Sequence, residues 1–127
     1  MMTRIMVVED NPVNMRIIEN GIAEKSKDIE VVVVNNASEA IFYYLTQHFD
    51  LVFLDIMMPK ISGYHFLTII EENIKAGHIK QNANIVVQTA ISALAELTAI
   101  AEKEIVQDVI RKPITIQQIH ESIEMYC

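Results

Sequence analysis

Five short runs of apolar residues are spread along this chain, and they constrain its fold more than any other feature. Each run is nearly continuous rather than alternating, which is typical of strands that are buried on both faces. A sheet buried in this way needs a layer of helices on each side. The runs are Ile5–Val8, Val31–Val34, Leu51–Leu54, Ile85–Val87 and Val109–Ile110.

The segments between the runs have the spacing of amphipathic helices, and several begin with helix-start signals. Asn11-Pro12 predicts a cap followed by a first-turn proline, whereas 36–39 and 115–118 resemble capping boxes. The residues expected to face the core are Val13, Ile17, Ile18, Gly21 and Ile22 in the first helix, Ala40, Ile41, Tyr44 and Leu45 in the second, Gly63, Leu67, Ile70 and Ile74 in the third, Leu94, Leu97 and Ala101 in the fourth, and Ile116, Ile119 and Ile123 in the fifth.

Strict alternation of five strands with five helices predicts an α/β fold, with a five-stranded parallel sheet and helices on both faces. The 127 residues suit one domain spanning 1–127, because a second domain would lack the length for its own core. A composition of 51% hydrophobic and 21% charged residues is that of a folded globular chain.

Charge, cysteine content and hydropathy argue against several classes of function. A net charge of −7 without a basic run is unlike a nucleic-acid-binding surface. The single cysteine, Cys127, allows no internal disulfide and fits a reducing compartment. No apolar run reaches the roughly 18 residues that span a bilayer, and the first residues lack a signal-peptide layout. We therefore expect a cytoplasmic protein that contacts neither nucleic acid nor membrane directly.

Polar residues follow four of the five apolar runs. Glu9-Asp10 follows the first run, Asp55 the third, Thr89-Ala90 the fourth and Lys112-Pro113 the fifth. In a parallel α/β sheet, ligands bind just beyond the carboxyl ends of the strands. The sequence therefore predicts that three carboxylates, one hydroxyl and one ammonium group converge at one edge of the sheet.

Three neighbouring carboxylates would repel one another unless a cation joins them. Two carboxylates about 4 Å apart repel by about 4 kcal/mol at an effective dielectric of about 20. Ligands that offer only oxygen select Mg²⁺, Mn²⁺ or Ca²⁺ over zinc, and Mg²⁺ suits a site with so few carboxylates. Lys112 adds a charge that can hold an anion beside the metal, and Thr89 adds a hydroxyl. Together these groups suit the transfer of a phosphoryl group onto a carboxylate.

The same motifs resemble, across essentially the whole chain, the response-regulator receiver domain of two-component and phosphorelay signalling. They are "VVEDNPVN" at 7–14, "LDIMMPKISG" at 54–63, "TA" at 89–90 and "RKP" at 111–113. Each motif alone is weak, but four in register on alternating strands and helices are specific. The resemblance implies the flavodoxin-like strand order 2-1-3-4-5.

The resemblance also implies roles for individual residues. Asp55 would accept a phosphoryl group from a histidine on a sensor histidine kinase or a histidine phosphotransfer protein. Asp10 would bind Mg²⁺ directly, Glu9 largely through water, and Met57 through its backbone carbonyl; Asp55 would complete this metal site. The domain would then catalyse its own phosphorylation and slow dephosphorylation, without being a conventional enzyme.

Further roles concern the phosphorylated state. Thr89, the backbone of Ala90 and Lys112 would contact the phosphoryl group, and Pro113 would follow a cis peptide bond. Receivers usually carry an aromatic switch residue three positions before the lysine, but that position here is Val109. Thr89 would then still move on phosphorylation, while the output surface is read differently or changes less. By the same resemblance, that surface comprises the fourth helix, fifth strand and fifth helix, with Ile91, Leu94 and Val109 as its apolar residues.

Three other functions compete with this interpretation. A haloacid dehalogenase-type phosphohydrolase needs a second aspartate two positions after the nucleophile, where this chain has Met57. A flavodoxin-like cofactor carrier would place a phosphate beside Glu9 and Asp10, which would repel it. A pseudo-receiver that binds partners without phosphorylation remains the alternative from a different class.

Overall fold

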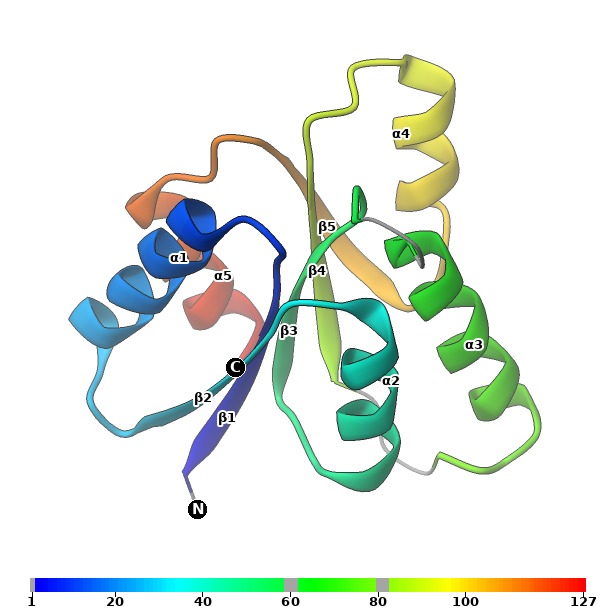
Figure 1. Cartoon of the computed structure of the whole chain (residues 1–127), viewed down its shortest axis with the longest axis horizontal. Coiled ribbons are helices and arrows are strands. Elements are labelled where there is room, and N and C mark those ends of the chain that lie inside the picture. The colour runs from blue at the N-terminus through cyan, green and yellow to red at the C-terminus, as the bar shows by residue number, and fades with distance from the viewer. Residues whose placement is uncertain (1, 59–61, 80–82) are drawn as a thin grey trace.

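A computed structural model describes residues 2–58, 62–79 and 83–127, in which strands and helices alternate along the chain (Figure 1). The strands are β1 (Thr3–Val8), β2 (Ile29–Val34), β3 (Leu51–Asp55), β4 (Asn84–Thr89) and β5 (Val106–Arg111). The helices are α1 (Pro12–Lys25), α2 (Ala37–Thr46), α3 (Gly63–Lys75), α4 (Leu94–Ala101) and α5 (Ile116–Tyr126). No helix in these ranges is long and apolar enough to cross a membrane.

The strands form one parallel sheet in the order β2-β1-β3-β4-β5, as predicted. Helices α1 and α5 cover one face, and α2, α3 and α4 cover the other (Figure 1). Alternate residues of the inner strands enter different cores because successive side chains point to opposite faces. In β3, for example, Val52 and Leu54 join the core under α2 and α3, whereas Leu51 and Phe53 join the core under α1 and α5. This double burial explains the continuous apolar runs.

The predicted helix starts are confirmed in their capping contacts. The side chain of Asn11 accepts hydrogen bonds from the backbone N–H groups of Val13 and Asn14, at 2.9 and 3.2 Å. Thr115 and Gln118 form a complete, reciprocal capping box. The box at α2 is only half made: Asn36 caps the backbone of Glu39, but the Glu39 side chain meets the Asn36 amide instead of its backbone.

Two predictions about the edge of the sheet were wrong. β5 begins at Val106 instead of Val109. Its residues Gln107 and Asp108 are polar and exposed, as an edge strand allows, so no continuous apolar run marks the start of this strand. The predicted apolar face of α4 is also wrong, since Ile100 is its one buried residue and Leu94 is 77% exposed. α4 packs mainly against this edge strand, which leaves it little surface to bury.

Other helices bury a narrower stripe than their apolar spacing predicted. On α1, the buried residues are Ile18, Gly21 and Ile22, whereas Val13 and Ile17 lie at the surface. Leu45 on α2 and Ile116 on α5 are exposed as well. Val13 and Ile116 lie in the first turns of their helices and Leu45 lies in the last turn of α2.

Candidate phosphorylation and metal site

The polar residues predicted at the strand ends do converge at the carboxyl edge of the sheet. Asp55 and Thr89 are the last residues of β3 and β4, rather than the residues that follow them. Glu9 and Asp10 come directly after β1, and Lys112 comes directly after β5. Because β1, β3, β4 and β5 are parallel, all these residues lie at the same edge, which is at the upper side of the sheet in Figure 1.

Asp55 is held almost completely out of solvent, with 1% of its surface exposed. Its Oδ1 accepts a hydrogen bond from the backbone N–H of Met57 at 3.0 Å. Its Oδ2 lies 3.0 Å from the Nζ of Lys112 in an ion pair. One carboxylate oxygen is thus fixed by the backbone, while the other faces a cation.

Gly63, the first residue of α3, permits the backbone to pass close to Asp55. A Cβ atom at this position would lie 2.7 Å from the backbone oxygen of Asp55 and 2.8 Å from the Cα of Ile56. Gly63 also donates its N–H to the Ile56 carbonyl at 3.0 Å. The absent side chain therefore lets the start of α3 pack directly behind the site.

Glu9 is fully buried, and its carboxylate is held by three donors. The backbone N–H of Asn11 donates to Oε1 at 3.1 Å, the Nε2 of Gln88 donates to Oε2 at 3.0 Å, and the Nζ of Lys112 lies 3.3 Å from Oε2. Burial, followed by the negative charge of Asp55, raises the pKa of Glu9 from 4.5 to about 7 despite these donors. Part of the Glu9 population is therefore protonated near neutral pH.

Lys112 links the two buried carboxylates. Burial disfavours its ammonium form, but hydrogen bonding and attraction to Asp55 and then Glu9 outweigh that effect and raise the pKa of Lys112 above its usual value. Lys112 therefore stays charged at neutral pH. The backbone N–H of Lys112 donates to the Thr89 carbonyl at 2.8 Å, which ties this residue to the end of β4. The peptide bond between Lys112 and Pro113 is cis.

Three of the predicted metal ligands lie close enough to share one ion. One carboxylate oxygen from each of Glu9, Asp10 and Asp55 falls within a group whose members are at most 4.8 Å apart. Glu9 and Asp55 are buried, whereas Asp10 is exposed and can meet a hydrated cation at the surface. Oxygen-only donors with one open side fit Mg²⁺, which usually keeps several of its waters. The side chain of Met57 is exposed, and its backbone carbonyl remains a predicted ligand.

Apart from Lys112, the residues predicted to act after phosphorylation make no hydrogen bond to Asp55 among the described residues. Thr89 is buried, and its Oγ1 accepts a hydrogen bond from the backbone N–H of Ile91 at 3.0 Å. No hydrogen bond joins Thr89 to Asp55 among the described residues. Ala90 is exposed, and Val109 is half-buried against the core under α2 and α3, as is Ile91.

Sequence reasoning missed Gln88, the second-last residue of β4. Gln88 is fully buried, and its amide contacts Glu9 across a separation of 79 residues. Its Oε1 has no partner among the described residues. A buried polar atom without a partner costs about 1–3 kcal/mol. The sequence did carry a signal, because Gln88 is an amide residue that directly follows the apolar run Ile85–Val87. Nothing in the sequence indicated which residue the amide contacts.

Comparison with known proteins agrees with this geometry. Residues 5–124 match the family described as the response regulator receiver domain. The match covers most of the chain, and this protein therefore belongs to the response-regulator receiver family.

Named relatives and solved structures extend the comparison. The chain is 25% identical over 122 residues to the polar-differentiation response regulator DivK of Brucella ovis, covering 96% of this chain and 94% of that protein. The signal receiver domain of a LuxO repressor protein from Vibrio parahaemolyticus has a TM-score of 0.85 at 19% identity, covering 99% of this chain and 90% of that one. The response regulator TrrA of Thermotoga maritima, solved in complex with Mg²⁺ and BeF, has a TM-score of 0.79 at 25% identity, covering 99% and 100%.

Proposed function

We propose that this domain accepts a phosphoryl group onto Asp55 from a phosphohistidine, with Mg²⁺ bound by Asp10, Asp55 and Glu9. The observation that carries the proposal is the pairing of a buried Asp55 oxygen with the Lys112 ammonium at 3.0 Å, inside a group of three carboxylates. The complex of the relative TrrA with Mg²⁺ and BeF supports the choice of metal.

The chain's own residues supply the positioning that phosphoryl transfer needs. The backbone N–H of Met57 fixes the Asp55 carboxylate, so that one of its oxygens can attack phosphorus. An O–P bond forms at Asp55 as the P–N bond to the donor histidine breaks, and the histidine nitrogen keeps the electron pair. Lys112 then pairs with the transferred phosphoryl oxygens in place of the free carboxylate. Bound Mg²⁺ would neutralise negative charge on the phosphoryl oxygens during the transfer.

A sensor histidine kinase or a histidine phosphotransfer protein is the partner class that this chemistry requires. Asp55 itself is buried, so the donor histidine has to approach across the exposed surface around Asp10. In the proposed output response, Thr89 releases the Ile91 backbone and turns toward the phosphoryl group. Val109 is too small to follow as an aromatic residue would. Of the apolar residues expected on the output surface, Leu94 is the most exposed.

The first test is the intact mass of the protein after incubation with phosphoramidate, with and without Mg²⁺. Phosphoramidate carries the same P–N bond as phosphohistidine, so uptake from it tests the donor class. We expect the wild type to gain one phosphoryl group only with Mg²⁺, and Asp55→Asn to gain none. Asp28→Asn, which changes an exposed aspartate, is the matched control and is expected to behave like the wild type.

The same experiment separates the proposal from its main alternative. If folded wild-type protein gains no mass with Mg²⁺ and donor, then the chain acts as a pseudo-receiver. Uptake that persists in Asp55→Asn would instead assign the phosphoryl group to another residue.

A further inference from the structure

Gln88 is a buried polar residue whose placement the core does not explain. It belongs to β4, one position before Thr89, and its register partners are Asp55 on β3 and Ile110 on β5. The neighbouring Val86 and Ile110 enter the apolar core under α1 and α5. An apolar side chain of similar size would satisfy that core, so the amide itself requires an explanation.

The contact that Gln88 makes points to the metal site. Its Nε2 donates to the Oε2 of Glu9 at 3.0 Å, while its Oε1 is buried without a partner among the described residues. Native proteins rarely leave a buried polar atom unpaired, and such atoms occur at functional sites or beside ordered water. At this position the amide nitrogen makes one hydrogen bond to Glu9, while the amide oxygen is left unpaired among the described residues.

The value of that hydrogen bond lies in the neutrality of its donor. Lys112 also holds Glu9, but its charge cancels negative charge that would otherwise attract a cation. The Gln88 amide fixes the same carboxylate without changing the charge of the site. It thereby helps to hold Glu9 at the edge shared with Asp10 and Asp55.

We infer that Gln88 is a positioning residue for divalent cation binding. Its hydrogen bond fixes the orientation of the Glu9 carboxylate, so that Glu9, Asp10 and Asp55 each present an oxygen to one ion. This inference rests on the proposed function, because it takes Glu9, Asp10 and Asp55 as the cation site. Groups in the outer shell of a metal site commonly change metal affinity by 10-fold to 100-fold when they are substituted.

The test compares Gln88→Met and Gln88→Leu with the wild type in two independent measurements. The first is the dissociation constant for Mg²⁺, obtained from backbone amide shifts during titration with MgCl₂. The second is the midpoint of urea unfolding in the presence of a chelator. We expect both variants to bind Mg²⁺ about tenfold more weakly. Their unfolding midpoint without metal is expected to stay close to that of the wild type, because loss of the hydrogen bond to Glu9 offsets the removal of the unpaired oxygen.

Val86→Ala is the matched control, since Val86 lies two positions earlier on the same face of β4. It is expected to lower the urea midpoint and to leave the Mg²⁺ dissociation constant unchanged. Mg²⁺ affinity within twofold of the wild type in either Gln88 variant would overturn the inference, as would an equal loss of affinity in Val86→Ala. A wild type that binds no Mg²⁺ would overturn the proposed metal site and this inference together.

Discussion

Replacing Glu9 with glutamine is expected to remove much of the pH dependence of stability in the metal-free protein. The pKa of Glu9 is raised from 4.5 to about 7 by burial and by the charge of Asp55. Between these two values the folded state binds a proton that the unfolded state has released. Proton binding by Glu9 therefore stabilises the folded state fully below pH 4.5, and this stabilisation is lost as the pH rises toward 7 and above.

The size of the effect follows from the displacement of the pKa. Each pKa unit corresponds to about 1.4 kcal/mol, so the shift from 4.5 to about 7 sets an upper limit of about 3.5 kcal/mol over the whole range. Between pH 5 and pH 8, after allowance for the coupling of Glu9 to Asp55 and Lys112, we expect the wild type to lose about 2 kcal/mol more than Glu9→Gln.

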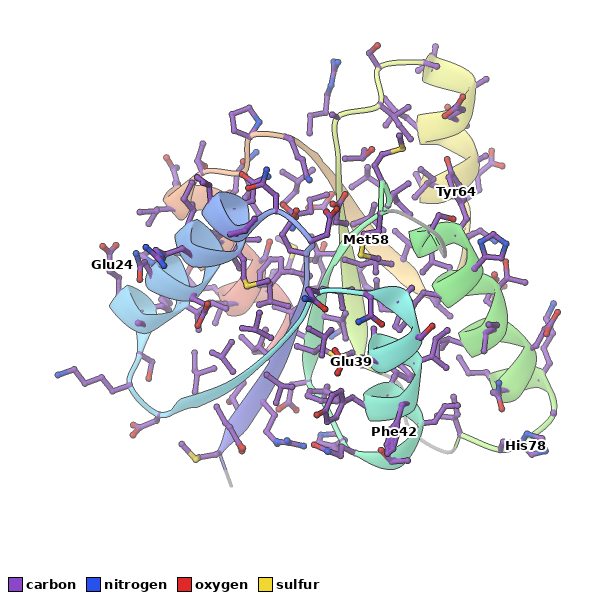
Figure 2. The ribbon with its side chains drawn as sticks, viewed as in Figure 1. Glu24, Glu39, Phe42, Met58, Tyr64 and His78 are labelled. Atoms are coloured by element: carbon purple, nitrogen blue, oxygen red, sulfur yellow. The ribbon has the colours of Figure 1, made fainter. Side chains whose placement is uncertain are left out.

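Urea unfolding followed by far-ultraviolet circular dichroism, at pH 5, 6, 7 and 8 with a chelator present, measures this difference directly. Contributions from the histidines cancel, because both proteins carry them. Glu24→Gln on the exposed surface of α1, labelled in Figure 2, is the control and is expected to follow the wild type. Parallel pH profiles for wild type and Glu9→Gln, separated by a constant amount, would refute the claim that burial beside Asp55 controls the ionisation of Glu9.

Two further predictions concern local packing. Gly63→Ala places a Cβ atom 2.7 Å from the Asp55 backbone oxygen. We therefore expect the free energy of unfolding, measured in urea, to fall by about 1–3 kcal/mol and phosphoryl uptake to become slower. Unchanged stability would show that α3 moves freely. Thr115→Ala removes the capping box of α5 and is expected to cost about 1 kcal/mol without changing phosphoryl uptake, and a loss of uptake would mean that α5 positions Lys112.

Much of the fold could be predicted because its signals are local. The continuous apolar runs indicated strands that are buried on two faces, and the capping residues Asn11 and Thr115 indicated where two helices begin. The start of β5 at Val106 could not be predicted, because an edge strand has one side exposed to solvent and carries polar residues there. The exposed position of Leu94 depends likewise on how little of the sheet α4 covers.

The sequence alone determined that Glu9, Asp10, Asp55 and Lys112 gather at one site, since parallel strands bring their carboxyl ends to the same edge of the sheet. Only the tertiary structure decided how those residues interact. The hydrogen bond from Gln88 to Glu9, the ion pair of Lys112 with Asp55 and the raised pKa of Glu9 depend on distances between side chains from different strands. Electrostatic and hydrogen-bond energies change steeply over an ångström, whereas a sequence pattern specifies only which strand end carries each group.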